Sequence, residues 1–180
     1  MTKQERVKAP QIDQVRRPRN DCVAAFLSAA VKRFAGNRYS GNQLFTSFAD
    51  AISFNWSETG ELPLLSHGGV IECFDRVVRD LKVNLRIDLT RFREIPYEGY
   101  YEFAQEQMKS GKFVGIGYRS SFIFGGTGDH LHISEICGVS PRHVRLRDHE
   151  LANHPLISWE TIEVATLSAG SGFWSISKLT

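Results

Sequence analysis

The feature that most constrains the fold is an apolar run that begins at Cys22 and reads CVAAFLSAAV. Its helical pattern extends to about Phe34, and Gly36 then allows the helix to end. Asn20 or Asp21 can cap the first turn, because their side-chain oxygens accept hydrogen bonds from free backbone N–H groups. The apolar residues are not confined to one stripe. We therefore expect a helix that is buried on most of its sides.

Helical patterns dominate the first part of the chain and strand patterns the second part. Helices are predicted over 40–54, 69–81 and 100–108. Strands are predicted over 85–89, 113–118, 131–138, 143–148 and 173–177. A short helix over 157–167, which Ser158 can cap, interrupts the later strands. This order indicates an α+β fold, with a helical part (21–111) packed on a C-terminal antiparallel sheet (112–180).

Composition is that of an ordinary globular protein, with 180 residues, 42% hydrophobic and 23% charged. We divide the chain into a basic N-terminal arm (1–20) and a single domain (21–180). A net charge of +2 favours neither nucleic acid nor an anionic membrane as partner. No segment resembles a membrane span, and the first residues lack the apolar core of a signal peptide. We expect a protein made in the cytoplasm, with export as an effector as the other option.

The three cysteines are an odd number and lie far apart, so a disulfide framework is not expected. A zinc site built from them with His130 and His132 would lack the close spacing of zinc modules. The sequence therefore predicts no metal and no cofactor.

Cys22 has the local setting of a nucleophile. The free N–H groups and the dipole of a helix N-terminus favour a thiolate there. The alternative is a small buried hydrophobic residue, which is the usual role of a free cysteine. Because a capped first turn is expected to lie near solvent, we favour the nucleophile.

A base and an acid follow in the second part of the chain. His130 and His132 share one face of a predicted strand, so either could be the base. Asp148 shares a strand face with Val144 and Leu146, and a carboxylate on an apolar face needs a partner. A histidine N–H would be such a partner, which would complete the set of nucleophile, base and orienting acid.

The hairpin register decides whether this pair can form. If Gly138 pairs with Arg142, His132 pairs with Asp148. A two-residue turn at Ser140-Pro141 would instead place Asp148 opposite Ile133, on the wrong face. The triad therefore predicts an odd-length loop or a bulge within 139–142.

These residues resemble the papain-like cysteine peptidases, closest in style to the bacterial branch of bacteriocin-leader-processing (double-glycine) peptidases. That family has its cysteine at the N-terminus of a central helix, often as Asp-Cys, like Asp21-Cys22. Its histidine opens a strand with a glycine six residues on, like His132 and Gly138, and its Asp or Asn follows on the next strand, like Asp148. Ser158 to Ile162 and the last strand fit its C-terminal helix and strand. The resemblance, from about residue 14 to the end, implies a papain-like fold with Cys22, His132 and Asp148 as catalytic triad.

The oxyanion donor departs from the family pattern. The family has a glutamine five or six residues before the cysteine, where this chain has Arg17 and Arg16. Gln14 or Asn20 would have to take that role beside the Cys22 backbone N–H. Val23 also replaces a frequent glycine.

A glycine- and serine-rich stretch, 120–128, precedes His132 and is predicted to be a loop that gates the substrate. Within and beside it, Phe122, Phe124, Gly128 and His130 are candidate substrate-binding residues.

The predicted activity is hydrolysis of a peptide or amide bond, in a bacterial or phage-borne thiol protease acting on a peptide or protein. Two alternatives stay open. The same triad serves peptidoglycan amidases, isopeptidases and acyl or amide transferases. An inactive papain-like module that binds a peptide or protein would also fit the missing glutamine. Nucleic acid, contacted through the basic arm, is the least favoured of the possible partners.

Overall fold

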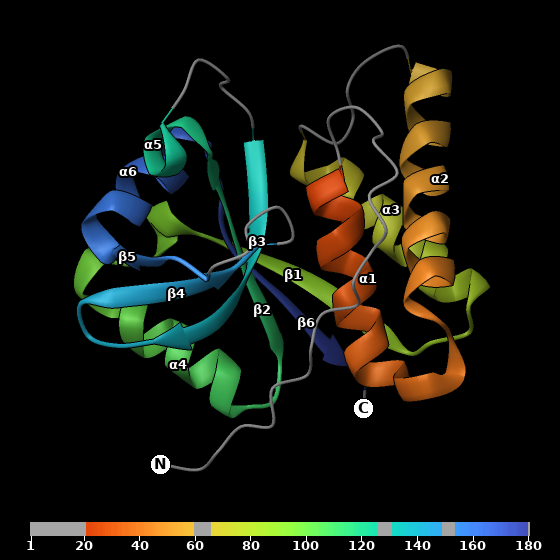
Figure 1. The fold of residues 1–180 in the computed structure, drawn as a ribbon, viewed down its shortest axis with the longest axis horizontal. Coiled ribbons are helices and arrows are strands. Elements are labelled where there is room, and N and C mark those ends of the chain that lie inside the picture. The colour runs from red at the N-terminus through yellow and green to blue at the C-terminus, as the bar shows by residue number, and fades with distance from the viewer. Residues whose placement is uncertain (1–20, 60–65, 126–130, 149–153, 180) are drawn as a thin grey trace.

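The computed structural model describes residues 21–59, 66–125, 131–148 and 154–179. Three helices lie on one side of a sheet: α1 (Asp21–Ala35), α2 (Gly41–Thr59) and α3 (His67–Asp80) (Figure 1). On the other side lie α4 (Tyr100–Lys109), α5 (Ser121–Phe124) and α6 (Trp159–Ser168). Within the described residues, the connections include the short 3₁₀ helices η1 (Gly36–Arg38), η3 (Phe92–Glu94) and η4 (Tyr97–Gly99).

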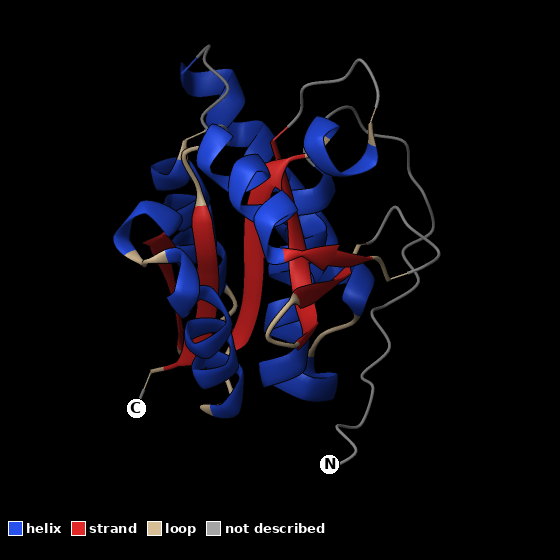
Figure 2. Ribbon diagram, turned by 90° about the vertical axis from the view of Figure 1, so that its left-hand side faces the viewer, coloured by secondary structure: helices blue, strands red, loops and turns tan. Residues whose placement is uncertain are grey.

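The sheet has six strands in the order β1-β6-β2-β3-β4-β5, and every neighbouring pair is antiparallel. The strands are β1 (Leu85–Arg91), β2 (Phe113–Arg119), β3 (Leu131–Val139), β4 (His143–Arg147), β5 (Leu156–Ser158) and β6 (Gly172–Lys178). The last strand of the chain thus lies between β1 and β2. Figure 2 shows the helices on both sides of this sheet, which confirms the predicted α+β architecture.

Each face of the sheet has its own hydrophobic cluster. Side chains alternate between the faces along β2: Phe113 belongs to one cluster, and Val114 and Ile116 belong to the other. The α1 core, between α1–α3 and the sheet, includes Leu27, Phe48, Phe74, Ile133 and Trp174. The α6 core, on the opposite face, includes Phe92, Tyr118, Leu146, Ile162 and Phe173.

The predicted central helix is confirmed as α1, which is buried on most sides. Ala24, Leu27, Ala30 and Val31 are almost fully inaccessible to solvent. Gly115 of β2 allows this close packing, because a Cβ there would lie 2.2 Å from the ring of Phe26 on α1. Helix α1 therefore packs closely against β2 at the contact between Phe26 and Gly115.

Two sequence predictions need correction. The helix expected over 157–167 begins at Trp159, because residues Leu156–Ser158 first pair with β4 as strand β5. Ser158 still caps it, accepting a hydrogen bond from the Thr161 backbone N–H at 3.2 Å. The stretch predicted as a loop from residue 120 begins with the short helix α5.

Among the described residues, none of the helices has the length and apolarity required to cross a membrane.

Candidate active site

Cys22 is the second residue of α1, and its side chain is only 6% exposed. This corrects the prediction that the first turn would lie near solvent. Cys22 belongs to the α1 core, and its thiol lies near enough to His132 of β3 to raise the pKa of that imidazole. The capping role predicted for Asn20 and for the Asp21 side chain lies outside the described residues.

The β3–β4 hairpin brings His132 close to Asp148, but its turn and its bulge lie at other residues than predicted. Ser140 and His143 exchange two backbone hydrogen bonds of 2.8 and 3.3 Å, so the two-residue turn is Pro141-Arg142. Gly138 pairs with Arg145, which corrects the predicted pairing with Arg142.

A register shift between Ile136 and Gly138 adds one residue to β3, and this extra residue places Asp148 on the same face of the sheet as His132. The bulge therefore occurs at Cys137, before the predicted segment 139–142. Beyond the bulge Glu135 pairs with Arg147, and one further step brings Asp148 opposite Ser134, two residues from His132 on the same face. Without the extra residue, Asp148 would face Glu135 on the wrong side of the sheet.

Asp148 is 5% exposed and accepts several hydrogen bonds at one carboxylate oxygen. His132 Nε2 hydrogen-bonds to Oδ2. Ser134 Oγ donates to the same oxygen at 2.6 Å, and the Tyr118 hydroxyl lies 3.4 Å from it. Tyr118 and Ser134 also hydrogen-bond to each other at 2.7 Å. These donors offset the cost of burying a carboxylate on the apolar face of β4.

The surroundings of His132 favour its charged form. Burial lowers the pKa of His132, but hydrogen bonds with Asp148 and Cys22 and their negative charges outweigh burial and raise the pKa to about 10. Since Nε2 faces Asp148, Nδ1 is the ring nitrogen left for Cys22. Burial raises the pKa of Tyr118, so its hydroxyl stays a neutral donor near Asp148. The site thus brings a thiol, an imidazole and a carboxylate into one hydrogen-bonded row.

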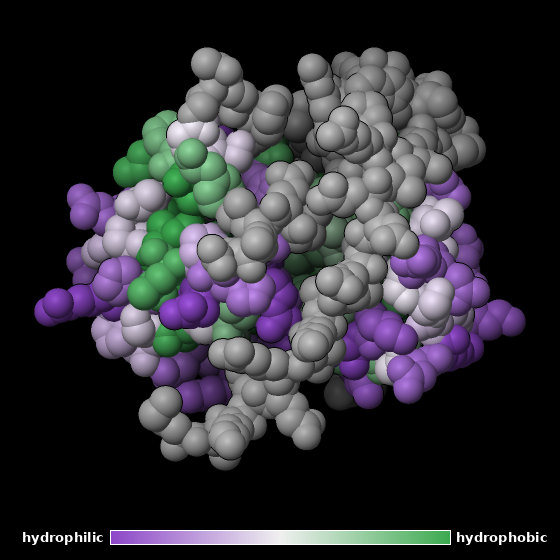
Figure 3. Space-filling view, in the orientation of Figure 1, coloured by the Kyte–Doolittle hydropathy of each residue, from purple (hydrophilic) through white to green (hydrophobic). Residues whose placement is uncertain are grey.

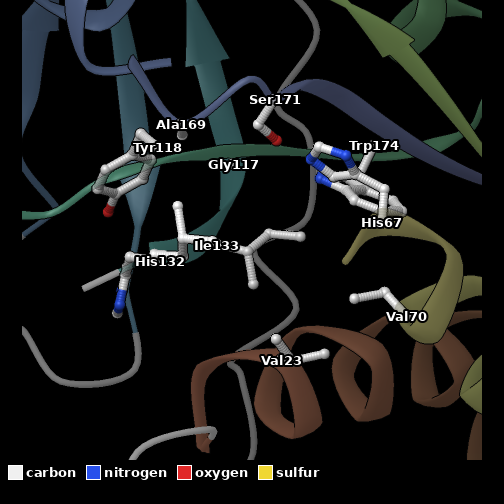
Figure 4. Close-up of a pocket in the computed structure, with 11 residues that line it drawn as sticks. Val23, His67, Val70, Gly117, Tyr118, His132, Ile133, Ala169, Ser171 and Trp174 are labelled. Carbon is white, nitrogen blue, oxygen red and sulfur yellow. The ribbon is translucent and has the colours of Figure 1, made fainter. Parts of the chain in front are cut away.

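A pocket that is partly open to solvent lies beside His132 (Figure 4). Val23 of α1 and Val70 of α3 form one wall, and Gly117 and Ile133 of the sheet form the opposite one. Its far end is formed by His67, Ser171 and Trp174. The arrangement gives a molecule that reaches Cys22 and His132 an adjacent cavity for one of its groups.

Of the other predicted site residues, the structure describes two. Phe124 is 41% exposed on α5, and its ring centroid lies 6.3 Å from that of His132, so it borders the site. Phe122 is exposed on the same helix, where Figure 3 shows apolar side chains gathered over α5 and α6, together with Val164 and Leu167. Gln14, Asn20, Gly128 and His130 lie outside the described residues.

Sequence reasoning did not identify Ser134 and Tyr118. Both could have been found from strand periodicity, because Ser134 lies two residues after His132 and Tyr118 pairs with His132 across β2 and β3. In the described part of the chain, no group of three or more His, Cys, Asp and Glu side chains is arranged to hold a metal ion.

Comparisons with known proteins support the fold. A scan against protein-family models and a search of curated proteins both find no match. Among solved structures, the chain is similar to a crystal structure from Bacillus anthracis described as a "putative C39-like peptidase". The TM-score is 0.60 at 16% sequence identity, and the match covers 96% of each chain. At this identity the likeness shows the fold alone, and it confirms the predicted papain-like α+β fold; the bacteriocin-leader-processing branch stays a prediction.

Proposed function

We propose that this protein is a cysteine peptidase that hydrolyses a peptide or amide bond, with Cys22 as nucleophile, His132 as general base and acid, and Asp148 as the orienting acid. The observation that carries the proposal is the position of His132, which hydrogen-bonds to Asp148 through Nε2 and lies near enough to Cys22 for the thiol to raise the pKa of the imidazole. The similarity in fold to a protein described as a peptidase supports it.

In the first half of the reaction, the proton of the Cys22 thiol resides on His132, which leaves a thiolate beside an imidazolium. The high pKa of His132 supports this ion pair. The thiolate sulfur attacks the carbonyl carbon of the substrate, and a tetrahedral oxyanion forms. His132 then gives its proton to the leaving amine as the C–N bond breaks, and a thioester with Cys22 remains.

In the second half, water replaces the amine. His132 takes a proton from the water, whose oxygen attacks the thioester carbonyl carbon. The C–S bond breaks, the acid product leaves, and Cys22 is regenerated. The Cys22 backbone N–H is in the first turn of α1, where such groups have no partner within the helix, so it can donate to the oxyanion. Gln14 or Asn20 would supply the second donor.

Ser134 and Tyr118 act in this proposal as positioning residues. Their hydroxyls bind the carboxylate of Asp148 and hydrogen-bond to each other. They hold Asp148 in the orientation that fixes the His132 ring.

The proposed substrate is a peptide or protein. Peptidoglycan amidases, isopeptidases and amide transferases share all steps as far as the thioester and differ in the acceptor that resolves it. Since all of these acylate Cys22, the test begins with this thiol.

The test is treatment of the native protein with limiting iodoacetamide, followed by peptide mapping. We expect Cys22 to be modified first, because desolvation raises the pKa of the Cys73 thiol and of the Cys137 thiol above the ordinary value. Preferential modification of Cys73 or Cys137 would contradict the proposal. Cys22→Ala should retain the thermal transition but lose cleavage of a library of fluorogenic peptide amides. An unmodified Cys22 and uncleaved peptides in the wild type would instead support the inactive binding module.

A further inference from the structure

The end of the pocket away from His132 carries polar atoms that face its floor. A Cβ placed on Gly117 would lie 2.3 Å from Ser171 Oγ and 3.1 Å from Trp174 Nε1, so both atoms lie close above this glycine. Ser171 and Trp174 are 6% and 3% exposed. Within the described ranges, neither the Ser171 hydroxyl nor Trp174 Nε1 makes a hydrogen bond. Both polar groups line the pocket and are therefore available to a group that enters it.

The backbone holds these two side chains in place. The Ser171 N–H donates to the Thr166 carbonyl at 3.1 Å, and the Ser171 carbonyl accepts from the Phe92 N–H at 3.2 Å. Trp174 lies inside the sheet, paired with Leu89 on β1 and Gly115 on β2. A group that enters the pocket therefore meets donors that are already oriented.

His67 extends the same polar end from the first residue of α3. Its ring centroid lies 5.6 Å from that of Trp174, and in Figure 4 the nitrogen atoms of both rings lie on the side of Ser171. Burial and the positive charge of Arg91 lower the pKa of His67, so the ring is neutral at pH 7.

The polar groups at this end of the pocket favour a ligand group that accepts hydrogen bonds. Trp174 Nε1 can only donate, the Ser171 hydroxyl can donate, and the lining residues that the structure describes include no carboxylate to balance a cation. The approach from the catalytic residues passes the apolar side chains of Val23, Val70 and Ile133. A fitting group has a short hydrocarbon stem and an sp² oxygen at its end.

We propose that this pocket binds a substrate side chain that ends in a carboxamide or carboxylate, as in glutamine or glutamate, with Ser171 and Trp174 as its donors. The inference rests on the proposed peptidase function and names the class of residue that the enzyme selects near the scissile bond. An apolar side chain of the same length, such as methionine, would leave both donors unpaired and therefore binds more weakly.

The experiment uses peptidyl vinyl sulfones, which trap a nucleophilic cysteine without turnover. Each carries glutamine, glutamate or methionine at one of the three positions nearest to the electrophile, with alanine elsewhere. The rate of Cys22 modification is followed by intact mass. At one position, we expect glutamine or glutamate to react about 5- to 160-fold faster than methionine, the range given by about 1–3 kcal/mol for a polar group left without its hydrogen bond. Glutamine faster than glutamate identifies the carboxamide, and the reverse order identifies the carboxylate.

Two variants connect the preference to the pocket. Ser171→Ala and Trp174→Phe each remove one donor and keep most of the shape. Each should reduce the ratio of the glutamine or glutamate rate to the methionine rate, with every rate divided by the iodoacetamide rate of the same variant. Ser177→Ala, on the same strand but away from the pocket, should leave the ratio unchanged. Thermal melts show whether each variant folds. If one variant does not fold, the rate ratio of the other variant alone tests the inference.

The outcomes separate this inference from the proposed function. If Cys22 reacts with the peptidyl probes but methionine matches glutamine and glutamate at all three positions, the pocket inference is overturned and the peptidase proposal survives. A preference that persists in both donor variants also overturns it. If no peptidyl probe modifies Cys22 while iodoacetamide does, the peptidase proposal fails and the pocket inference fails with it.

Discussion

The two faces of the sheet contribute different chemistry to the candidate site. The α1 core supplies Cys22, which lies among aliphatic and small side chains at the start of a helix. The α6 core reaches Asp148 through Tyr118, whose hydroxyl lies near the carboxylate together with that of Ser134. His132, at the start of β3, hydrogen-bonds to Asp148, and the thiol of Cys22 lies near enough to raise its pKa. The site therefore forms only when both cores are packed against one sheet.

The two faces of the sheet should therefore differ in whether their residues affect mainly reactivity or also stability. The cysteine side has few polar groups, so its reactivity depends on the imidazole that comes from the sheet. The acid side has its own hydrogen-bond network, and its disruption should affect stability as well as chemistry. Variants of the residue that joins the faces should have the largest effect on activity, and variants within one face smaller effects.

His132→Gln tests the connection between the faces. The variant keeps a polar side chain but cannot exchange a proton between Cys22 and the leaving group, so we expect cleavage to fall about 10²–10⁴-fold. The measurement is kcat/KM on a fluorogenic peptide amide, together with the rate of Cys22 alkylation. His143→Gln on β4 is the matched control and should retain activity, because His143 lies at the turn end of the hairpin. Equal losses in both variants would mean that the loss reflects folding rather than chemistry.

Asp148→Asn tests the acid face without changing its shape. We expect a loss of roughly 10²-fold or more in kcat/KM, because the imidazolium loses its counter-charge and its preferred tautomer can change. The hydrogen bond and charge of Asp148 raise the pKa of His132, so the alkaline limb of the activity profile should shift to lower pH.

Asp148→Leu sharpens the same comparison. It removes the buried carboxylate from a face that already contains Val144 and Leu146, so the protein can be as stable as the wild type or more stable while activity is lost. Thermal melts and kinetics of both variants are the measurements. Full activity in Asp148→Asn would show that Asp148 is only structural.

Ser134→Ala should have a smaller effect on activity. It removes the 2.6 Å donor to Asp148 but leaves the Tyr118 hydroxyl, so we expect a loss of roughly 3- to 10-fold in kcat/KM and about 1–3 kcal/mol in the free energy of unfolding. A positioning role predicts that the alkaline limb of the pH profile changes too, which a purely structural role would not cause. Ser134→Thr retains a hydroxyl and should restore part of both properties. Ser140→Ala in the turn is the control for the hairpin.

Local patterns in the sequence were sufficient to predict most of the helices and strands and to select Cys22, His132 and Asp148, whose catalytic role stays a proposal. The apolar run of α1 predicted its burial, and the face shared by Val144, Leu146 and Asp148 predicted a buried acid. These features depend on helical and strand periodicity, which each segment carries in itself. Strand β5 escaped prediction because three residues are too short for a period of two to be visible.

The features that escaped prediction depend on contacts between distant segments. The bulge at Cys137 depends on how Ile136 and Leu146 pack in the α6 core, which no local pattern encodes. The burial of Cys22 depends on its contact with β3, more than a hundred residues away in the sequence. The roles of Ser134 and Tyr118 required the strand register, since either hydroxyl could have bonded elsewhere.

The smallest effect concerns the dependence of stability on pH. The pKa of His132 is raised in the folded state to about 10 from its ordinary value of 6.5, so the folded protein binds a proton there that the unfolded chain releases. Its contribution to stability is therefore complete below about pH 6.5 and is lost as the pH rises through about 10. Urea unfolding of the wild type and of His132→Gln at pH 6, 8 and 10 measures this contribution as the difference between the two proteins. We expect the advantage of the wild type to decrease over this series, because the charged imidazole that joins Cys22 to Asp148 is progressively neutralised. A difference that stays constant with pH would show that His132 is neutral in the folded protein, and the two faces would then be connected by hydrogen bonds without an ion pair.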